Sequence, residues 1–154
     1  MPFGLATWFG AGLMPKAPGT WGSLAALPVA WLVLRYGGFW WLAAAVGLIF
    51  LVGWWASNVY VAGTSAEDPG AVVIDEVAGQ WLTLLPVAPL VWWHWVAGFV
   101  LFRFFDILKP WPVGWADRRV KGGFGVMIDD VIAGLYAGGL LYGLILIEES
   151  NYFL

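Results

Sequence analysis

The sequence predicts an all-α protein, a polytopic helical bundle embedded in a membrane as a single domain over residues 1–154. Hydrophobic residues make up 62% of the chain and charged residues 11%, whereas soluble domains carry about 25% charged residues. The mean hydropathy is +0.81, and several uncharged stretches approach the length of a membrane span. The same composition excludes a disordered chain. A net charge of −3 and the lack of cysteine exclude a nucleic-acid binder and a disulfide scaffold.

The first two predicted helices form a pair in the N-terminal third of the chain. A span needs about 20 apolar residues, and residues 39–57, which are uncharged, give the clearest candidate. Residues 21–34 give a shorter candidate, and the sequence Arg-Tyr-Gly-Gly at 35–38 is expected to form a tight turn between the two. Just before the first helix, Thr20 or Ser23 is expected to act as its N-cap.

The middle of the chain allows two interpretations. One is a single span over residues 81–102. The other is a hairpin, with a helix to about Leu85, a turn marked by Pro86 and Pro89, and a return helix over residues 91–108. The positive-inside rule favours the hairpin, because only the hairpin leaves a single basic residue, Arg35, outside. The basic residues then on the cytoplasmic side are Lys16, Arg103, Lys109, Arg118, Arg119 and Lys121.

The final predicted span covers residues 131–147, which are uncharged and are followed by two glutamates. Within it, Ala133 and Ala137 are four residues apart, as are Gly134 and Gly138, and this spacing lets helices approach closely in lipid. We therefore expect this helix to pack tightly against another helix. His94, which stands among tryptophans near the tip of the hairpin, is expected to be an interfacial residue.

The predicted topology gathers most of the charge on the cytoplasmic face. Five acids lie near expected helix ends there: Asp75, Glu76, Asp106, Asp129 and Asp130. Two carboxylates about 4 Å apart repel by about 4 kcal/mol at an effective dielectric constant of about 20, so such a group needs cations among its members. Three basic residues, Lys16, Arg103 and Lys109, leave a shortfall of two charges, which one Mg²⁺ would supply. Oxygen ligands without cysteine or a nearby histidine favour Mg²⁺ or Mn²⁺.

Spacing supports the convergence of these groups. Arg103, Asp106 and Lys109 follow one another at intervals of three residues, so they share one helix face. The segment 18–23 would present backbone amides at a helix start, which is a natural seat for phosphate. Each signal also has a purely structural interpretation: Arg103 and Asp106 could form an ordinary ion pair, and Asp129 and Asp130 could simply cap the last helix.

These residues resemble the phosphatidylglycerophosphatase A family of bacterial membrane phosphatases. The resemblance extends from about Leu5 to Tyr142 and is strongest in the Lys-Pro-Trp-Pro motif at 109–112 and the Asp-Asp pair at 129–130. The other matching stretches are Pro18-Gly19-Thr20, Gly22-Ser23-Leu24-Ala25, Asp75-Glu76 with Gly79 and Trp81, Phe102-Arg103, Phe105-Asp106, Asp117-Arg118, Gly122-Gly123, Gly125 and Ala133-Gly134. The resemblance implies that the substrate is phosphatidylglycerophosphate, that Mg²⁺ is needed, and that the site faces the cytoplasm of a bacterial inner membrane.

Within that chemistry, roles can be assigned to individual residues. The chain lacks the cysteine of a cysteine-nucleophile phosphatase and the Asp-x-Asp motif of a haloacid-dehalogenase-type phosphatase. Its one histidine is isolated, which argues against a histidine nucleophile. Metal-assisted hydrolysis is the mechanism that remains. Glu76, Asp129 and Asp130 are the expected Mg²⁺ ligands. The substrate phosphate is expected to contact Arg103 and Lys109, together with Lys16 and Thr20. Asp75 and Asp106 both remain open as the general base, and a carboxylate nucleophile is a further alternative.

The sequence argues against two other classes of protein. A CDP-alcohol phosphotransferase would also bind a metal through membrane acids, but its spaced Asp-Gly, Ala-Arg and Asp-x-x-x-Asp signature is absent. A small transporter would place charges near the bilayer midplane, often within an internal repeat, and this chain shows no repeat. An oligomer is compatible with the sequence, which specifies no oligomeric state.

Overall fold

The computed structural model describes residues 2–63 and 70–151 and is all-helical over these residues. Its helices are α1 (Pro2–Ala6), α2 (Pro18–Gly37), α3 (Phe39–Gly63), α4 (Ile74–Thr83), α5 (Trp92–Leu108), α6 (Val113–Arg119) and α7 (Gly122–Asn151), with a 3-10 turn, η1, at Ala11–Leu13. Two of the described helices, α3 over Phe39–Tyr60 and α7, are long and apolar enough to cross a membrane. The all-α prediction is confirmed, whereas the membrane crossing of these and of further helices stays a prediction.

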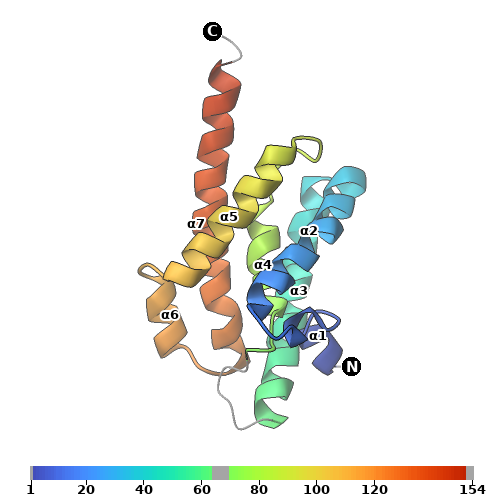
Figure 1. Cartoon of the computed structure of the whole chain (residues 1–154), viewed down its shortest axis with the longest axis vertical. Coiled ribbons are helices and arrows are strands. Elements are labelled where there is room, and N and C mark those ends of the chain that lie inside the picture. The colour runs from blue at the N-terminus through green and yellow to red at the C-terminus, as the bar shows by residue number, and fades with distance from the viewer. Residues whose placement is uncertain (1, 64–69, 152–154) are drawn as a thin grey trace.

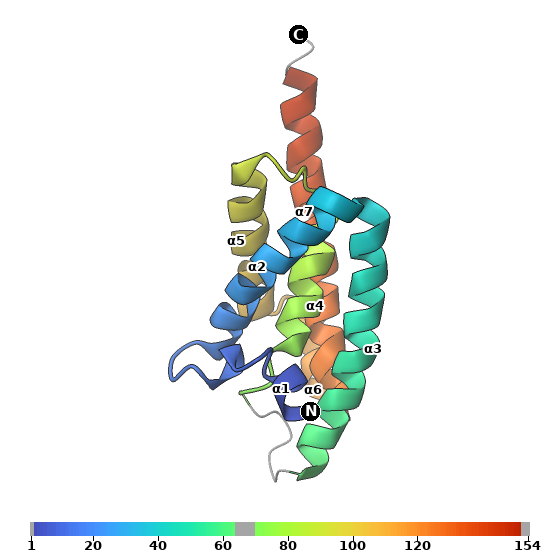
Figure 2. The ribbon, with the colours of Figure 1, turned by 90° about the vertical axis from the view of Figure 1, so that its right-hand side faces the viewer.

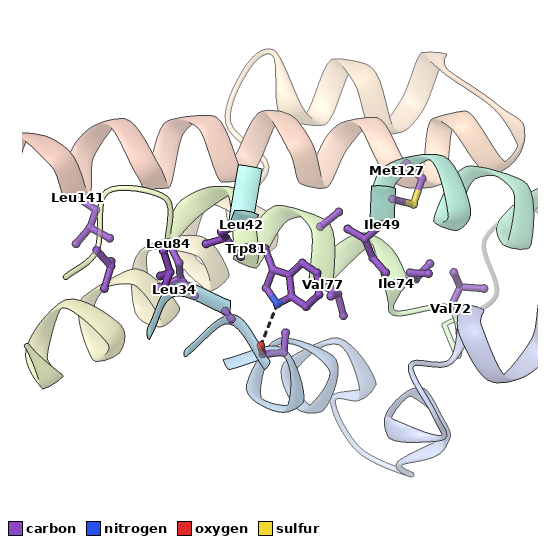
Figure 3. Close-up of a cluster of buried hydrophobic side chains, with 14 of the residues drawn as sticks. Leu34, Leu42, Ile49, Val72, Ile74, Val77, Trp81, Leu84, Met127 and Leu141 are labelled. Atoms are coloured by element: carbon purple, nitrogen blue, oxygen red, sulfur yellow. Dashed lines mark hydrogen bonds between the residues drawn. The ribbon is translucent and has the colours of Figure 1, made fainter. Parts of the chain in front are cut away.

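The short helix α4 lies at the centre of the bundle and contacts α2, α3, α5 and α7 (Figures 1 and 2). Its apolar residues are buried on all sides, which is why a helix of only ten residues persists here. Figure 3 shows Trp81 of α4 among the buried side chains, where its indole Nε1 donates a hydrogen bond of 2.9 Å to the carbonyl oxygen of Ala26 in α2. This bond satisfies the only polar atom of a large buried side chain.

Helices α4 and α7 touch through their backbones. A Cβ added at Gly134 would lie 2.6 Å from the carbonyl oxygen of Gly79, and one added at Gly79 would lie 2.6 Å from the carbonyl oxygen of Asp130. No residue with a side chain fits at either position without moving the helices apart. The close approach expected from the small residues of the last helix is thus confirmed, and it brings Asp130 beside α4.

The hairpin in the middle of the chain is confirmed, and the alternative single span over residues 81–102 is wrong. Helix α4 ends at Thr83 and α5 begins at Trp92, with Pro86 and Pro89 in the connection. Proline lacks the amide hydrogen that a continuous helix needs, so the chain turns here. Helices α4 and α5 therefore run back along each other, and the end of α5 returns to the level at which α4 begins.

Two local expectations near the N-terminus are corrected. Thr20 and Ser23 lie inside α2 and do not cap it, and the Ser23 hydroxyl instead donates a hydrogen bond of 2.9 Å to the Gly19 carbonyl. The turn expected at 35–38 shrinks to Gly38, whose φ of 77° lies in the left-handed region that favours glycine. His94 is buried within the protein, where its Nε2 lies 3.1 Å from Glu148 Oε2 of α7, and its place at the membrane interface stays a prediction.

The last helix begins nine residues earlier than expected, at Gly122. Its glycine-rich start reads as a loop in sequence, but Asn58 of α3 accepts a hydrogen bond of 2.8 Å from the Gly123 amide and so caps α7 from a distance. As a result Asp129 and Asp130 lie inside α7, and the alternative interpretation in which they only cap the helix is wrong. Helix α6 lies between the predicted spans, where the sequence had predicted no helix.

Candidate active site

A cavity of about 570 Å³ opens at the end of the bundle where α2, α4 and α7 begin and α5 ends, with α6 forming one wall. Its described lining is rich in charge. The charged residues are Asp75, Glu76, Arg103, Asp106, Lys109, Asp117, Arg118, Lys121, Asp129 and Asp130, which amounts to six acids and four bases. The prediction that the charged motifs converge is confirmed for Asp75, Glu76, Arg103, Asp106, Lys109, Asp129 and Asp130.

The innermost group consists of Asp75, Glu76 and Asp130. One carboxylate oxygen from each lies within 4.8 Å of the others. Asp75 and Glu76 stand in the first turn of α4, and the backbone contact between Gly79 and Gly134 places Asp130 of α7 next to them. Among the described residues, Glu76 Oε2 and Asp130 Oδ2 are buried without a hydrogen-bond partner. Buried carboxylate oxygens without donors are costly, and a hard divalent cation bound by oxygen atoms removes that cost.

Arg103 of α5 holds the adjoining acids. Its Nη1 hydrogen-bonds Asp106 Oδ2, one turn along the same helix, and lies 3.9 Å from Glu76 Oε1. The start of α2 closes over this pair, because a Cβ at Gly19 would collide with the Glu76 carboxylate and lie 3.2 Å from Arg103 Nη1. The expected Arg103–Asp106 ion pair is therefore present, and it lies within the cavity wall.

Lys109 forms a second centre of charge by joining two helices. Its Nζ donates hydrogen bonds of 2.6 Å to Asp117 Oδ1 in α6 and 2.9 Å to Asp129 Oδ2 in α7. Burial favours the neutral amine, but the two hydrogen bonds and the charges of both acids outweigh burial, so the pKa of Lys109 lies above its usual value. The residue has a left-handed φ of 46° as it leaves α5, a conformation unusual for a residue with a side chain.

The arrangement differs from the sequence-based assignment in several places. Asp129, expected among the metal ligands, contacts Lys109, whereas Asp75, expected as a possible base, lies in the innermost group. Lys16 is exposed and Thr20 lies in the first turn of α2, and neither lines the cavity. Their phosphate contacts stay a prediction.

Sequence reasoning gave no role to Asp117, Arg118 or Lys121, which line the cavity. The available signal was Asp117-Arg118, which is one of the stretches that match the family. The sequence predicted no helix there, so nothing indicated that these side chains would reach the cavity.

Comparison with known proteins extends this picture. The family model for phosphatidylglycerophosphatase A matches residues 4–145. The chain is 43% identical to the protein of Escherichia coli named phosphatidylglycerophosphatase A, over 90% of this chain and 80% of that protein. It is 42% identical to the protein of the same name from Haemophilus influenzae, over 86% of this chain and 82% of that protein.

A third relative carries a different name. The chain is 42% identical to a putative phosphatidylinositol-3-phosphatase of Bacteroides thetaiotaomicron, over 89% of both chains. No solved structure matches the chain significantly. The family model covers nearly the whole chain, including every charged residue of the cavity, so the chain belongs to the phosphatidylglycerophosphatase A family.

Proposed function

We propose that the chain hydrolyses the terminal phosphate of phosphatidylglycerophosphate to phosphatidylglycerol and inorganic phosphate, with Mg²⁺ as cofactor. The single observation that carries this proposal is the cavity. In it, buried carboxylate oxygens without hydrogen-bond partners lie beside the basic side chains of Arg103 and Lys109. The relatives named phosphatidylglycerophosphatase A, at 42% and 43% identity, support the substrate.

The innermost carboxylates fit a magnesium ion. Asp75, Glu76 and Asp130 offer only oxygen, and two of their oxygens are buried without a partner. When bound, Mg²⁺ supplies Lewis-acid activation of the phosphate and of an attacking water. Asp129, predicted as a ligand, holds Lys109 at the edge of this group instead. The proposed ligand set is therefore Asp75, Glu76 and Asp130.

The chain's own residues then divide the remaining work. Arg103 and the protonated Lys109 lie where they can offset the charge that builds up on the phosphoryl oxygens. Asp106, which accepts a hydrogen bond from Arg103, is the proposed general base that takes a proton from the attacking water. The water oxygen forms the new bond to phosphorus, the bond from phosphorus to the glycerol oxygen breaks, and that oxygen is protonated from water in the cavity.

The relative from Bacteroides thetaiotaomicron suggests a second candidate substrate, phosphatidylinositol 3-phosphate. Both lipids carry a phosphodiester and a phosphomonoester separated by three carbons, with a hydroxyl on the central carbon. A site that reads this shared unit could accept either. The two alternatives weighed from the sequence, a phosphotransferase and a transporter, gain no support from the relatives, whose names are those of phosphatases.

The proposed location is a bacterial inner membrane, with several helices crossing it and the cavity facing the cytoplasm. The substrate is a membrane lipid, and two described helices are long enough to span. Four basic residues line the cavity: Arg103, Lys109, Arg118 and Lys121. The last three follow the end of α5, and the positive-inside rule favours the cytoplasmic side for this end of the bundle. Because the chain has no cysteine, a single cysteine at position 121 tests the orientation. Labelling by an impermeant reagent from the periplasmic side would contradict it.

The function itself is tested with the full chain purified in a neutral detergent. Phosphate release is measured from phosphatidylglycerophosphate and, in parallel, from phosphatidylinositol 3-phosphate. We expect turnover of the first lipid that stops with a chelator and returns with Mg²⁺. Turnover of the second lipid alone would establish the second candidate, and release from neither would overturn the proposal. Full activity in the chelator would overturn the magnesium assignment alone.

A further inference from the structure

Arg118 differs from the other basic residues of the cavity. Arg103 and Lys109 are each engaged by two carboxylates, but Arg118 makes no ion pair with any described residue, although its neighbour Asp117 does. It stands in the last turn of α6 and lines the cavity. A cation in a mostly acidic cavity that is left without a carboxylate is available for an anion from outside the chain.

The position of Arg118 is fixed by the helix that carries it. Val113 and Ala116 of α6 are buried, and the helix packs against α7. Gly114, one turn before Arg118, leaves room for the guanidinium: a Cβ there would lie 3.4 Å from Arg118 Nη1 and 2.6 Å from the carbonyl oxygen of Lys109. The arginine side chain is exposed, and its Nη1 folds back along α6 toward the Lys109 carbonyl.

The substrate class requires two anion sites. A phosphomonoester carries about −1.5 to −2 charges near neutral pH, and the diester of the same headgroup carries about −1. The innermost carboxylates with their metal, together with Arg103 and Lys109, account for the monoester. Nothing in that group is left for the diester, whereas Arg118 presents a planar fork of donors suited to two phosphate oxygens. A cavity of about 570 Å³ accommodates a whole small headgroup.

We propose that Arg118 binds the phosphodiester of the lipid headgroup and so selects substrates in which a diester and a monoester are separated by a three-carbon spacer. This inference rests on the proposed function and adds a residue that determines specificity. The competing interpretation is that Arg118 only attracts anionic lipid headgroups to the membrane surface. Arg119 separates the two interpretations, because it is the next residue, is also exposed, and does not line the cavity.

The experiment compares Arg118→Gln with the matched control Arg119→Gln in neutral detergent. Two substrates are used: phosphatidylglycerophosphate, which has both phosphates, and phosphatidic acid, which has the monoester alone. Losing a hydrogen-bonded charge contact should lower kcat/KM for the first substrate about 10- to 100-fold, mainly through KM, and leave the second within about twofold. Arg119→Gln should match the wild type on both, and Arg118→Lys should recover only part of the loss.

A second measurement does not depend on turnover of phosphatidic acid. Short-chain phosphatidylglycerol carries only the diester, so its inhibition constant should rise in Arg118→Gln by a similar factor and stay unchanged in Arg119→Gln. Equal losses in the two variants, or equal losses on the two substrates, would overturn the assignment of Arg118. A wild-type protein that releases no phosphate from phosphatidylglycerophosphate would overturn the proposed function instead. Direct binding of short-chain phosphatidylglycerol to both variants would then still decide the role of Arg118.

Discussion

Helices α5 and α7 meet near both ends of α5, and ionisable groups are paired in a different way at each meeting point. At the end remote from the cavity, Glu148 of α7 is fully matched: Oε1 accepts 3.1 Å from Trp93 Nε1, and Oε2 lies 3.1 Å from His94 Nε2. At the cavity end, roughly 28 Å away along α7, six acids face four bases, and two carboxylate oxygens have no partner among the described residues.

The difference separates a structural contact from a candidate functional cluster. A partly buried acid whose two oxygens are both hydrogen-bonded costs little and holds two helices together. Acids buried without donors destabilise the fold, so their retention points to chemistry that needs them. The two ends should therefore respond to mutation in opposite ways: the cavity end should lose activity and keep stability, and the remote end should do the reverse.

The largest effect is expected from Asp130→Asn. The change keeps the shape of the side chain but removes a charge from the innermost group, so kcat should fall by about two to four orders of magnitude. Thermal stability in the absence of Mg²⁺ should hold or rise, because a repulsive buried charge is lost. Phosphate release measures the fall in kcat, and a melting curve on the same preparation measures the stability. Near-normal turnover at limiting Mg²⁺ would remove Asp130 from the metal site.

An intermediate effect is expected from Lys109→Met. The variant loses one preorganised charge. The fall in kcat/KM should correspond to a loss of roughly 2 to 4 kcal/mol of transition-state stabilisation. Arg119→Met is the control, since Arg119 is exposed and does not line the cavity, and it should leave turnover nearly unchanged. Normal turnover in Lys109→Met would mean that the phosphate is held elsewhere.

The raised pKa of Lys109 fixes the sign of a pH effect. The lysine is protonated in both folded and unfolded chains below its unfolded pKa of about 10.4, so its ion pairs contribute fully there as long as Asp117 and Asp129 are ionised. That stability is lost only as the pH rises through the higher pKa of the folded state. We therefore expect that titration of Lys109 does not change the activity between about pH 6 and about pH 9, because this range lies below the unfolded pKa of the lysine.

The smallest effect on activity is expected from Glu148→Gln at the remote end. The variant weakens the contact with His94, so the melting temperature should fall by about 2 to 6 °C, while kcat/KM in detergent stays within about twofold of wild type. His94→Gln should behave in the same way. A large loss of turnover in a variant that melts normally would show that the two ends are coupled, and the comparison would then fail.

Much of the framework could be predicted from sequence because its causes are local. Two prolines break the helix between α4 and α5, and glycines four residues apart allow α7 to touch α4. The start of α7 could not be predicted in this way, because its glycines become helical only when Asn58, far away in the chain, caps them. Local propensity gives no sign of such a contact.

The site shows the same division. Counting charges predicted a surplus of acid, but not which acids would form the innermost group. Asp129 and Asp130 are adjacent, so their side chains point about 100° apart around α7. One of them faces Lys109 and the other faces α4, as the contacts show. The rotation of α7 that decides between them is set by the contact between Gly79 and Gly134, which depends on the packed bundle.

The contact between Gly79 and Gly134 also bears on how the protein is made. Helix α4, with ten residues, is about 15 Å long, half the thickness of the hydrocarbon core, and α7 follows it in the order of synthesis. While the ribosome is still translating residues beyond α5, the nascent chain holds Asp75 and Glu76 without the helix that completes their surroundings. The candidate site is therefore complete only when α7 has been made and packs against α4, and a chain terminated before α7 lacks Asp130.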